Sequence, residues 1–232
     1  PGSVELSQPG SMANLEIIEL TNERKKALDE PLTASELFSY RSSLGLLSWI
    51  TGRTRPDCAF RCSKAAQATS RAKISDLLEL NRAVRGLTST ADVIIRMHRG
   101  IVDMATCSVC SFGDSAFANT EGLKSQGGIV ACLVQPDHVE TLWRGRYDLQ
   151  IPIIQSSSIV KRVVRSTLSA EAYAVSETLE TAKWLRQLLF EFQPQQHGSS
   201  RALRSTDVTD RALSQRLPSS SRNFEQGADA SR

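Results

Sequence analysis

The side chains of this 232-residue chain that could carry chemistry are four carboxylates. Asp114 follows a short apolar run, and Glu171 lies near the start of a long apolar repeat. Asp207 and Asp210 come after that repeat ends. Carboxylates that meet at one point repel one another and stay ionised together only beside cations. Mg²⁺ is the expected cation, with Mn²⁺ as an alternative, because it binds hard oxygen ligands together with phosphate oxygens.

Each of these acidic residues also has a plainer interpretation. Asp114 is placed where a turn residue would follow a strand, and Glu171 could complement the dipole at the start of a helix. Asp207 and Asp210 are typical turn formers. The spacing of the four residues does not decide between catalysis and local structure.

The pattern around the acids predicts a sheet and a helix that would position them. Short β-like runs occur at 93–97, 107–114 and 127–134, and 138–146 is a candidate further strand. A long helix is expected from Ser166 to the residue before Pro194. Its apolar stripe is Leu168, Ala172, Val175, Leu179, Ala182, Leu185, Leu189 and Phe192. Glu171 lies one position off this stripe, so strand and helix could bring the carboxylates to one edge of a sandwich.

The first hundred residues predict a small, mainly helical unit with helices near 36–50, 57–72 and 75–87. Between Arg53 and Arg99 there are ten Lys and Arg against four acidic residues, a balance that suits a phosphate backbone. The alternative is a solvated helix face. Arg55 has its own alternative, a local ion pair with Asp57. The candidate nucleic-acid contacts are Arg53, Arg55, Lys64, Arg71 and Lys73.

The five cysteines indicate buried, reduced thiols rather than a metal site. Cys107 and Cys110 form a CxxC motif, but no second pair or His cluster completes a zinc site. The longest apolar run is too short for a membrane span, and no signal-peptide pattern opens the chain. We therefore expect an intracellular protein. Because the chain begins with Pro1, we also expect a fragment or a trimmed product.

Three motifs occur in an order that is specific in combination. The first is Tyr40-Arg-Ser-Ser-Leu-Gly-Leu-Leu-Ser-Trp49 followed by Thr54-Arg-Pro-Asp57. The second is Phe112-Gly-Asp-Ser-Ala-Phe-Ala-Asn119 with Ser125-Gln-Gly-Gly128, and the third is Arg165-Ser-Thr-Leu-Ser-Ala-Glu-Ala-Tyr173. Over about residues 1–193 the chain resembles the C-terminal part of a copia-type LTR retrotransposon Pol polyprotein. The matching part is the segment connecting polymerase and ribonuclease H, followed by the ribonuclease H-like domain.

The resemblance implies an α/β fold: a ribonuclease H-like mixed sheet with packed helices, preceded by a small helical connection module. The expected domains are 1–100 for that module, 101–217 for a ribonuclease H-like domain that is truncated or degenerate at its C-terminus, and 218–232 for a disordered tail. It also implies cleavage of RNA in RNA–DNA hybrids by two-metal phosphodiester hydrolysis. Asp114, Glu171 and Asp210 match the metal-binding carboxylates, with Asp207 as the alternative third ligand.

The implied partners are an RNA–DNA hybrid or other nucleic acid and the upstream polymerase domain of the parent polyprotein, with no membrane. The implied location is the cytoplasm or nucleus, or a virus-like particle if the parent element is active. The chain also departs from the family. The paired catalytic aspartates of the polymerase are absent, and residues 194–232 match neither the family's final helix nor its fourth carboxylate. A catalytically dead nucleic-acid-binding remnant is therefore the alternative.

Overall fold

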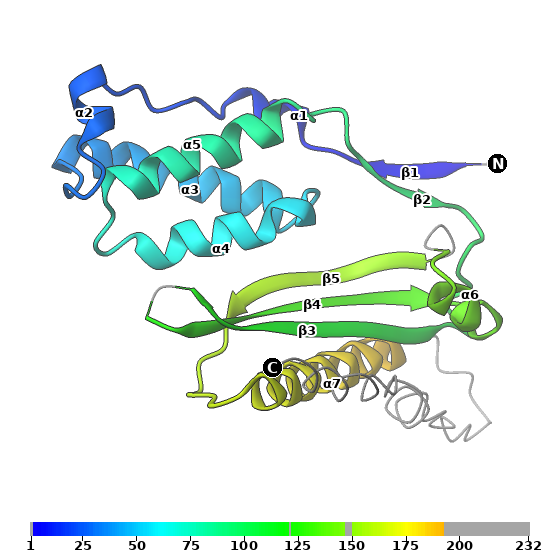
Figure 1. The fold of residues 1–232 in the computed structure, drawn as a ribbon. Coiled ribbons are helices and arrows are strands. Elements are labelled where there is room, and N and C mark those ends of the chain that lie inside the picture. The colour runs from blue at the N-terminus through cyan, green and yellow to red at the C-terminus, as the bar shows by residue number, and fades with distance from the viewer. Residues whose placement is uncertain (1, 121, 147–149, 193–232) are drawn as a thin grey trace, which may run out of the picture. The chain divides into compact units, whose positions relative to one another are not determined.

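The chain is a mixed α/β protein, and its described residues form helices and two small antiparallel sheets. The computed structural model describes residues 2–120, 122–146 and 150–192, apart from the side chain of Trp143 (Figure 1). Asp207, Asp210 and the predicted tail 218–232 lie outside these residues. No helix in the described ranges is long and apolar enough to cross a membrane.

The N-terminal part forms a helical unit around one hydrophobic core. Its elements are α1 (Pro9–Ala13), α2 (Asn22–Lys26), α3 (Ala34–Thr51), η1 (Pro56–Cys58), α4 (Ala59–Ala68) and α5 (Ile74–Thr88). The core contains Tyr40, whose hydroxyl donates a 2.8 Å hydrogen bond to the carbonyl oxygen of Ala65 in α4. The strands β1 (Ser3–Leu6) and β2 (Ile95–His98) pair antiparallel. The helices predicted near 36–50, 57–72 and 75–87 are present as α3, α4 and α5, with boundaries shifted by a few residues.

Helix α3 begins at a capping box. The Thr33 hydroxyl accepts a hydrogen bond from the Glu36 amide, and the Glu36 carboxylate accepts one from the Thr33 amide. Ser35 is the second residue of the helix. Arg24 donates two further hydrogen bonds to the Glu36 carboxylate, both at 2.9 Å, so the loop before α3 is tied to its first turn.

The second sheet is an antiparallel meander of β3 (Ser108–Thr120), β4 (Lys124–Val134) and β5 (Gln150–Ile159). Pro152 lies in β5, an outer strand of this sheet, where the register against β4 shifts. A proline has no amide to donate, so it is tolerated at such a position. The expected strand over 138–146 is wrong. That segment contains η2 (Pro136–His138) and α6 (Val139–Trp143), and the third strand follows it.

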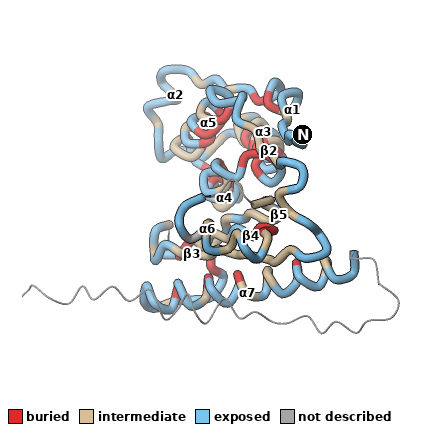
Figure 2. Tube along the Cα trace, turned by 90° about the vertical axis from the view of Figure 1, so that its right-hand side faces the viewer, coloured by how far each residue is buried: buried red, intermediate tan, exposed pale blue. Residues whose placement is uncertain are grey.

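Helix α7 (Thr167–Phe192) packs on the sheet through β3, but not with the face that the sequence predicted. Its buried residues are the small Ala170, Ala174 and Thr178, and then Leu185. Figure 2 shows that most of α7 is exposed, with only short buried stretches. Gly113 of β3 makes this contact possible, because a Cβ atom there would lie 1.8 Å from Thr178 Oγ1. The predicted stripe is partly solvent-facing: Leu168 is 75% exposed and Phe192 is 80% exposed. The buried face of α7 is the one whose small residues allow the helix backbone to approach β3 closely, and not the face with the large apolar side chains.

Candidate carboxylate site

Successive side chains of β3 point to opposite faces of the sheet, and two separate clusters show which face is which. Val109 packs in the cluster that contains Leu185 of α7. Cys110 and Phe112 pack in a second cluster with Leu142 of α6. Asp114 has the same parity as this second group, so its side chain leaves the sheet on the face away from α7.

The Asp114 carboxylate lies in open surroundings. Asp114 is exposed, and its Oδ1 accepts a 2.8 Å hydrogen bond from the Ser115 amide. Across the sheet its register partners are Gly128 of β4 and, beyond it, Ser157 of β5. Gly128 has no side chain and Ser157 has a small one, so both leave the carboxylate oxygens accessible to solvent and to a cation.

Glu171 lies in the second turn of α7 and is also exposed. Ala174, one turn later, has its carbonyl oxygen 3.1 Å from where a Cβ of Gly113 would be. One helical turn is about 5.4 Å, so the backbone of Glu171 starts close to the level of Asp114. Glu171 thus lies about one helical turn from the contact between α7 and Gly113, and the two carboxylate side chains start from opposite faces of the sheet.

The third predicted ligand lies beyond the described part of the chain, for Asp210 and for its alternative Asp207. Among the described side chains, no group of three or more His, Cys, Asp and Glu is arranged to hold a metal ion. The neighbouring Ser115 points to the α7 side, and its hydroxyl is buried without a hydrogen-bond partner in the described ranges. Of the predicted ligands, Asp114 is on β3, an outer strand of the sheet as described, and Glu171 is on the helix that packs against β3.

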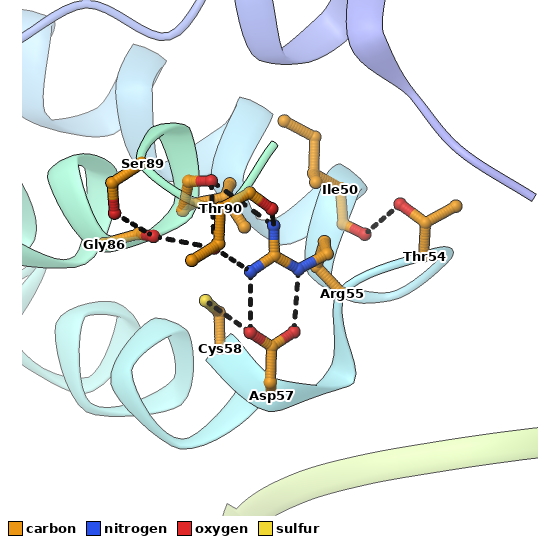
Figure 3. A network of polar contacts seen from close by, with 9 residues as sticks. Ile50, Thr54, Arg55, Asp57, Cys58, Gly86, Ser89 and Thr90 are labelled. Atoms are coloured by element: carbon orange, nitrogen blue, oxygen red, sulfur yellow. Dashed lines mark hydrogen bonds and ion pairs between the residues drawn. The ribbon is translucent and has the colours of Figure 1, made fainter. Parts of the chain in front are cut away.

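Arg55, one of the predicted nucleic-acid contacts, is instead a structural residue. Its side chain is 2% exposed, and its Nε and Nη2 donate to the Asp57 carboxylate at 2.9 and 2.8 Å (Figure 3). Nη1 donates to the carbonyl oxygens of Leu87 and Thr90 at 3.3 and 2.7 Å. Its hydrogen bonds and charge hold the pKa of Asp57 below the usual value. The assignment of Arg55 to nucleic-acid binding is therefore wrong, and the local ion pair is the interpretation that the structure shows.

The other four predicted contacts are exposed and lie on separate parts of the helical unit. Lys64 is on α4, and Arg71 and Lys73 are between α4 and α5. Lys73 Nζ is 3.1 Å from Asp29 Oδ1. Arg53 follows α3, and its guanidinium lies 4.9 Å from the centre of the Trp49 ring. These four residues remain accessible to a phosphate backbone.

Two tryptophans are exposed on the surface of helices. Trp49 is 53% exposed on α3, and Trp184 is 57% exposed on α7. Phe38, which is 77% exposed, lies eleven residues before Trp49 on α3 and therefore on nearly the same side of that helix. The outer face of α3 thus presents two aromatic rings with Arg53 at its end.

A cavity of about 410 Å³ lies near the end of α3 and the middle of β5. Its lining includes Glu5, Gln8, Arg53, Thr54 and Gln155. Neither Asp114 nor Glu171 is among the lining residues, so this cavity is not the carboxylate site.

Comparison of the chain with protein-family models, with curated proteins and with solved structures finds no match.

Proposed function

We propose that this chain is a fragment of a copia-type retrotransposon Pol polyprotein whose ribonuclease H-like part cleaves RNA in RNA–DNA hybrids. The observation that carries the proposal is one arrangement: an antiparallel three-strand meander followed by a helix packed on its first strand. Asp114 lies on that strand and Glu171 near the start of that helix. In this proposal, a strand and a helix in this order would supply the two carboxylates of one site.

The donor chemistry fits Mg²⁺. Asp114 and Glu171 are exposed carboxylates, and neither forms an ion pair within the described ranges. In this proposal they would hold the metal, with Asp210 as the third ligand and Asp207 as its alternative. When bound, the metal would supply Lewis acidity and an activated water. Joint binding requires the Asp114 side chain to turn toward the α7 side at the outer edge of β3.

The proposal is tested by cleavage of a labelled RNA–DNA hybrid by the full chain in Mg²⁺. Asp114→Asn and Glu171→Gln each remove one ligand charge, so each should lower the cleavage rate by about 100-fold or more. The matched controls are Asp137→Asn, an exposed aspartate after β4, and Glu177→Gln, an exposed residue of α7. Both controls should cleave at the wild-type rate.

Either of two results would refute the nuclease proposal. In the first, the wild-type chain leaves the hybrid intact while circular dichroism shows a folded protein. In the second, cleavage is equal in Asp114→Asn and Asp137→Asn, which would identify a contaminating nuclease. Retained hybrid binding without cleavage would support the alternative, a catalytically dead nucleic-acid-binding remnant.

The outer face of α3 favours this second candidate function. Exposed aromatic rings stack on nucleobases, and a nearby arginine adds attraction for phosphate. Trp49 with Arg53 provides such a pair. Trp49→Ala should then weaken binding of single-stranded or hybrid nucleic acid about fivefold or more, since one stacked base contributes about 1–3 kcal/mol. Trp184→Ala removes an equally exposed tryptophan from α7 and is the control. Equal affinities of the two variants would exclude this surface.

A further inference from the structure

Cys110 and Cys132 are directly opposed in the antiparallel register of β3 and β4. Opposed residues in such a pair have Cα atoms about 4.5–5.5 Å apart, which is within the range of about 4.4–6.8 Å that a disulfide spans. Both side chains are on the face away from α7, where they pack in the cluster that contains Leu142. The Sγ atom of Cys132 is 3.3 Å from the carbonyl oxygen of Cys110. The two thiols are therefore placed against each other.

We propose that Cys110 and Cys132 form a redox-active dithiol site that reacts with a low-molecular-weight disulfide such as oxidised glutathione. The product is a disulfide across β3 and β4. This inference does not rest on nuclease activity or on nucleic-acid binding, because it depends only on the pairing of the two strands.

The two thiols have different roles in this reaction. Cys110 is half-buried, whereas Cys132 is fully buried, so only Cys110 can meet an external disulfide first. The Cys132 thiol donates its hydrogen bond to the Cys110 carbonyl oxygen. The neighbouring Cys132 side chain lowers the pKa of the Cys110 thiol against the opposing effect of burial, and the Cys110 side chain together with burial raises the pKa of Cys132. Cys110 is thus the attacking thiol and Cys132 the resolving thiol.

The reaction proceeds by two thiol–disulfide exchanges. The Cys110 thiolate attacks one sulfur of oxidised glutathione, forming a mixed disulfide and releasing one glutathione thiolate, which takes up a proton. Cys132 then loses its proton, and its sulfur attacks the Cys110 sulfur and releases the second glutathione. Two protein thiols are oxidised by two electrons, and one glutathione disulfide is reduced to two thiols.

The structure selects Cys132 over the partner that the sequence motif suggests. Cys107 and Cys110 form the CxxC motif, but they are three residues apart and so face opposite sides. Cys107 packs in the cluster on the α7 side, and Cys110 packs on the other side. A Cys107–Cys110 bridge would have to pass through the plane of the sheet. Cys107 is therefore the matched control in the same segment.

The test is disulfide mapping of the folded full chain after incubation with oxidised glutathione. Free thiols are then blocked with N-ethylmaleimide, and the chain is digested with trypsin without reductant. Trypsin places Cys107 and Cys110 together in the peptide 100–124 and Cys132 in the peptide 125–144. We expect the protein to become two hydrogen atoms lighter and these two peptides to be linked. Fragmentation of the linked pair should assign the bond to Cys110.

Three variants complete the design. Cys107→Ser should keep the link, whereas Cys110→Ser and Cys132→Ser should each lower its yield about tenfold or more. The wild-type fragmentation spectrum gives the same assignment if a variant fails to fold. A bridge between Cys107 and Cys110, a link that survives in Cys110→Ser, or glutathione that stays on Cys110 without forming the bridge would each overturn the proposal. So would five thiols that all remain reduced.

Discussion

Arg55 shows how one side chain can organise a junction between helices. Its guanidinium reaches from the turn after α3 to the C-terminal end of α5, where it binds the carbonyl oxygens of Leu87 and Thr90. It also forms a two-bond ion pair with Asp57, a carboxylate that is 54% exposed. The Thr-Arg-Pro-Asp motif is therefore explained by local architecture, because the arginine and the aspartate of the motif are each other's partners.

Removing this guanidinium should destabilise the helical unit. In Arg55→Ala the two carbonyl oxygens lose their donor, and we expect the free energy of unfolding to fall by about 2–3 kcal/mol. Arg55→Lys should retain little of this stabilisation, because an ammonium group cannot form the two parallel hydrogen bonds that the guanidinium makes with Asp57. Urea unfolding measures both effects. Arg53→Ala, two residues away and exposed, should change stability by less than about 0.5 kcal/mol. Equal stability of the two alanine variants would contradict the role assigned to Arg55.

Glu36 should make the stability of the helical unit depend on pH. The hydrogen bonds from Arg24 lower the pKa of Glu36 to about 2, from a usual value of about 4.5. Because the folded-state pKa lies below the unfolded one, this stabilisation is complete above pH 4.5 and is lost as the pH falls toward 2. Thermal unfolding across this window should show a loss of about 1 kcal/mol that disappears in Glu36→Gln. Glu16→Gln, an exposed control, should leave the pH profile unchanged.

For Asp114 and Glu171, the sequence predicted the element on which each residue lies but not the face of the sheet from which each side chain extends. The apolar run before Asp114 predicted a strand, and the repeat after Glu171 predicted a helix; both elements are present. The face on which a strand residue lies depends on register, and shifting the register by one residue exchanges the two faces. No local pattern around Asp114 encoded that choice.

At the scale of elements, two of the differences between structure and sequence prediction have a clear physical cause. The strand β5 was missed because Pro152 and three consecutive serines (156–158) interrupt its apolar alternation, and its pairing with β4 comes from tertiary context. The buried face of α7 was predicted from large apolar residues, whereas the sheet accepts Ala170, Ala174 and Thr178. The close approach of the α7 and β3 backbones requires small residues at the contact. A pattern of hydrophobic residues alone does not predict such a contact.

That close approach gives a prediction for the packing of α7 on β3. Gly113→Ala would place a Cβ atom 1.8 Å from Thr178 Oγ1 and 2.9 Å from Thr178 Cβ, so helix and strand must separate. We expect a loss of at least about 2 kcal/mol in the free energy of unfolding, measured by chemical denaturation. Gly128→Ala is the matched control, because its nearest neighbour would be 4.0 Å away. If the two variants are equally stable, α7 does not pack on β3 in this way.

At the scale of the molecule, the helical unit and the meander have separate hydrophobic cores. The first contains Leu80, and the second contains Leu133. The contacts between them include polar ones: Gln126 of β4 donates to Ser63 Oγ at 3.0 Å and accepts from Gln67 at 3.1 Å. Polar contacts of this kind couple two cores weakly in comparison with shared apolar packing.

Hydrogen exchange should therefore show two independently opening units. Leu80→Ala, which removes about 2–5 kcal/mol of core packing, should reduce amide protection in α3 to α5 and leave β4 protected. Leu133→Ala should do the reverse. Loss of protection in both units from either variant would show that they open together.

Variation at Gly113 also offers a way to distinguish purifying selection on this sequence from neutral drift. Every amino-acid replacement of a glycine adds at least a Cβ atom, so nearly any missense change at this codon would push α7 away from the sheet. Gly128, with open space beside it, tolerates small replacements. If copies of this sequence in a genome vary freely at position 128 but keep glycine at 113, purifying selection is still acting on the folded product. Equal variation at both codons would instead be the signature of drift.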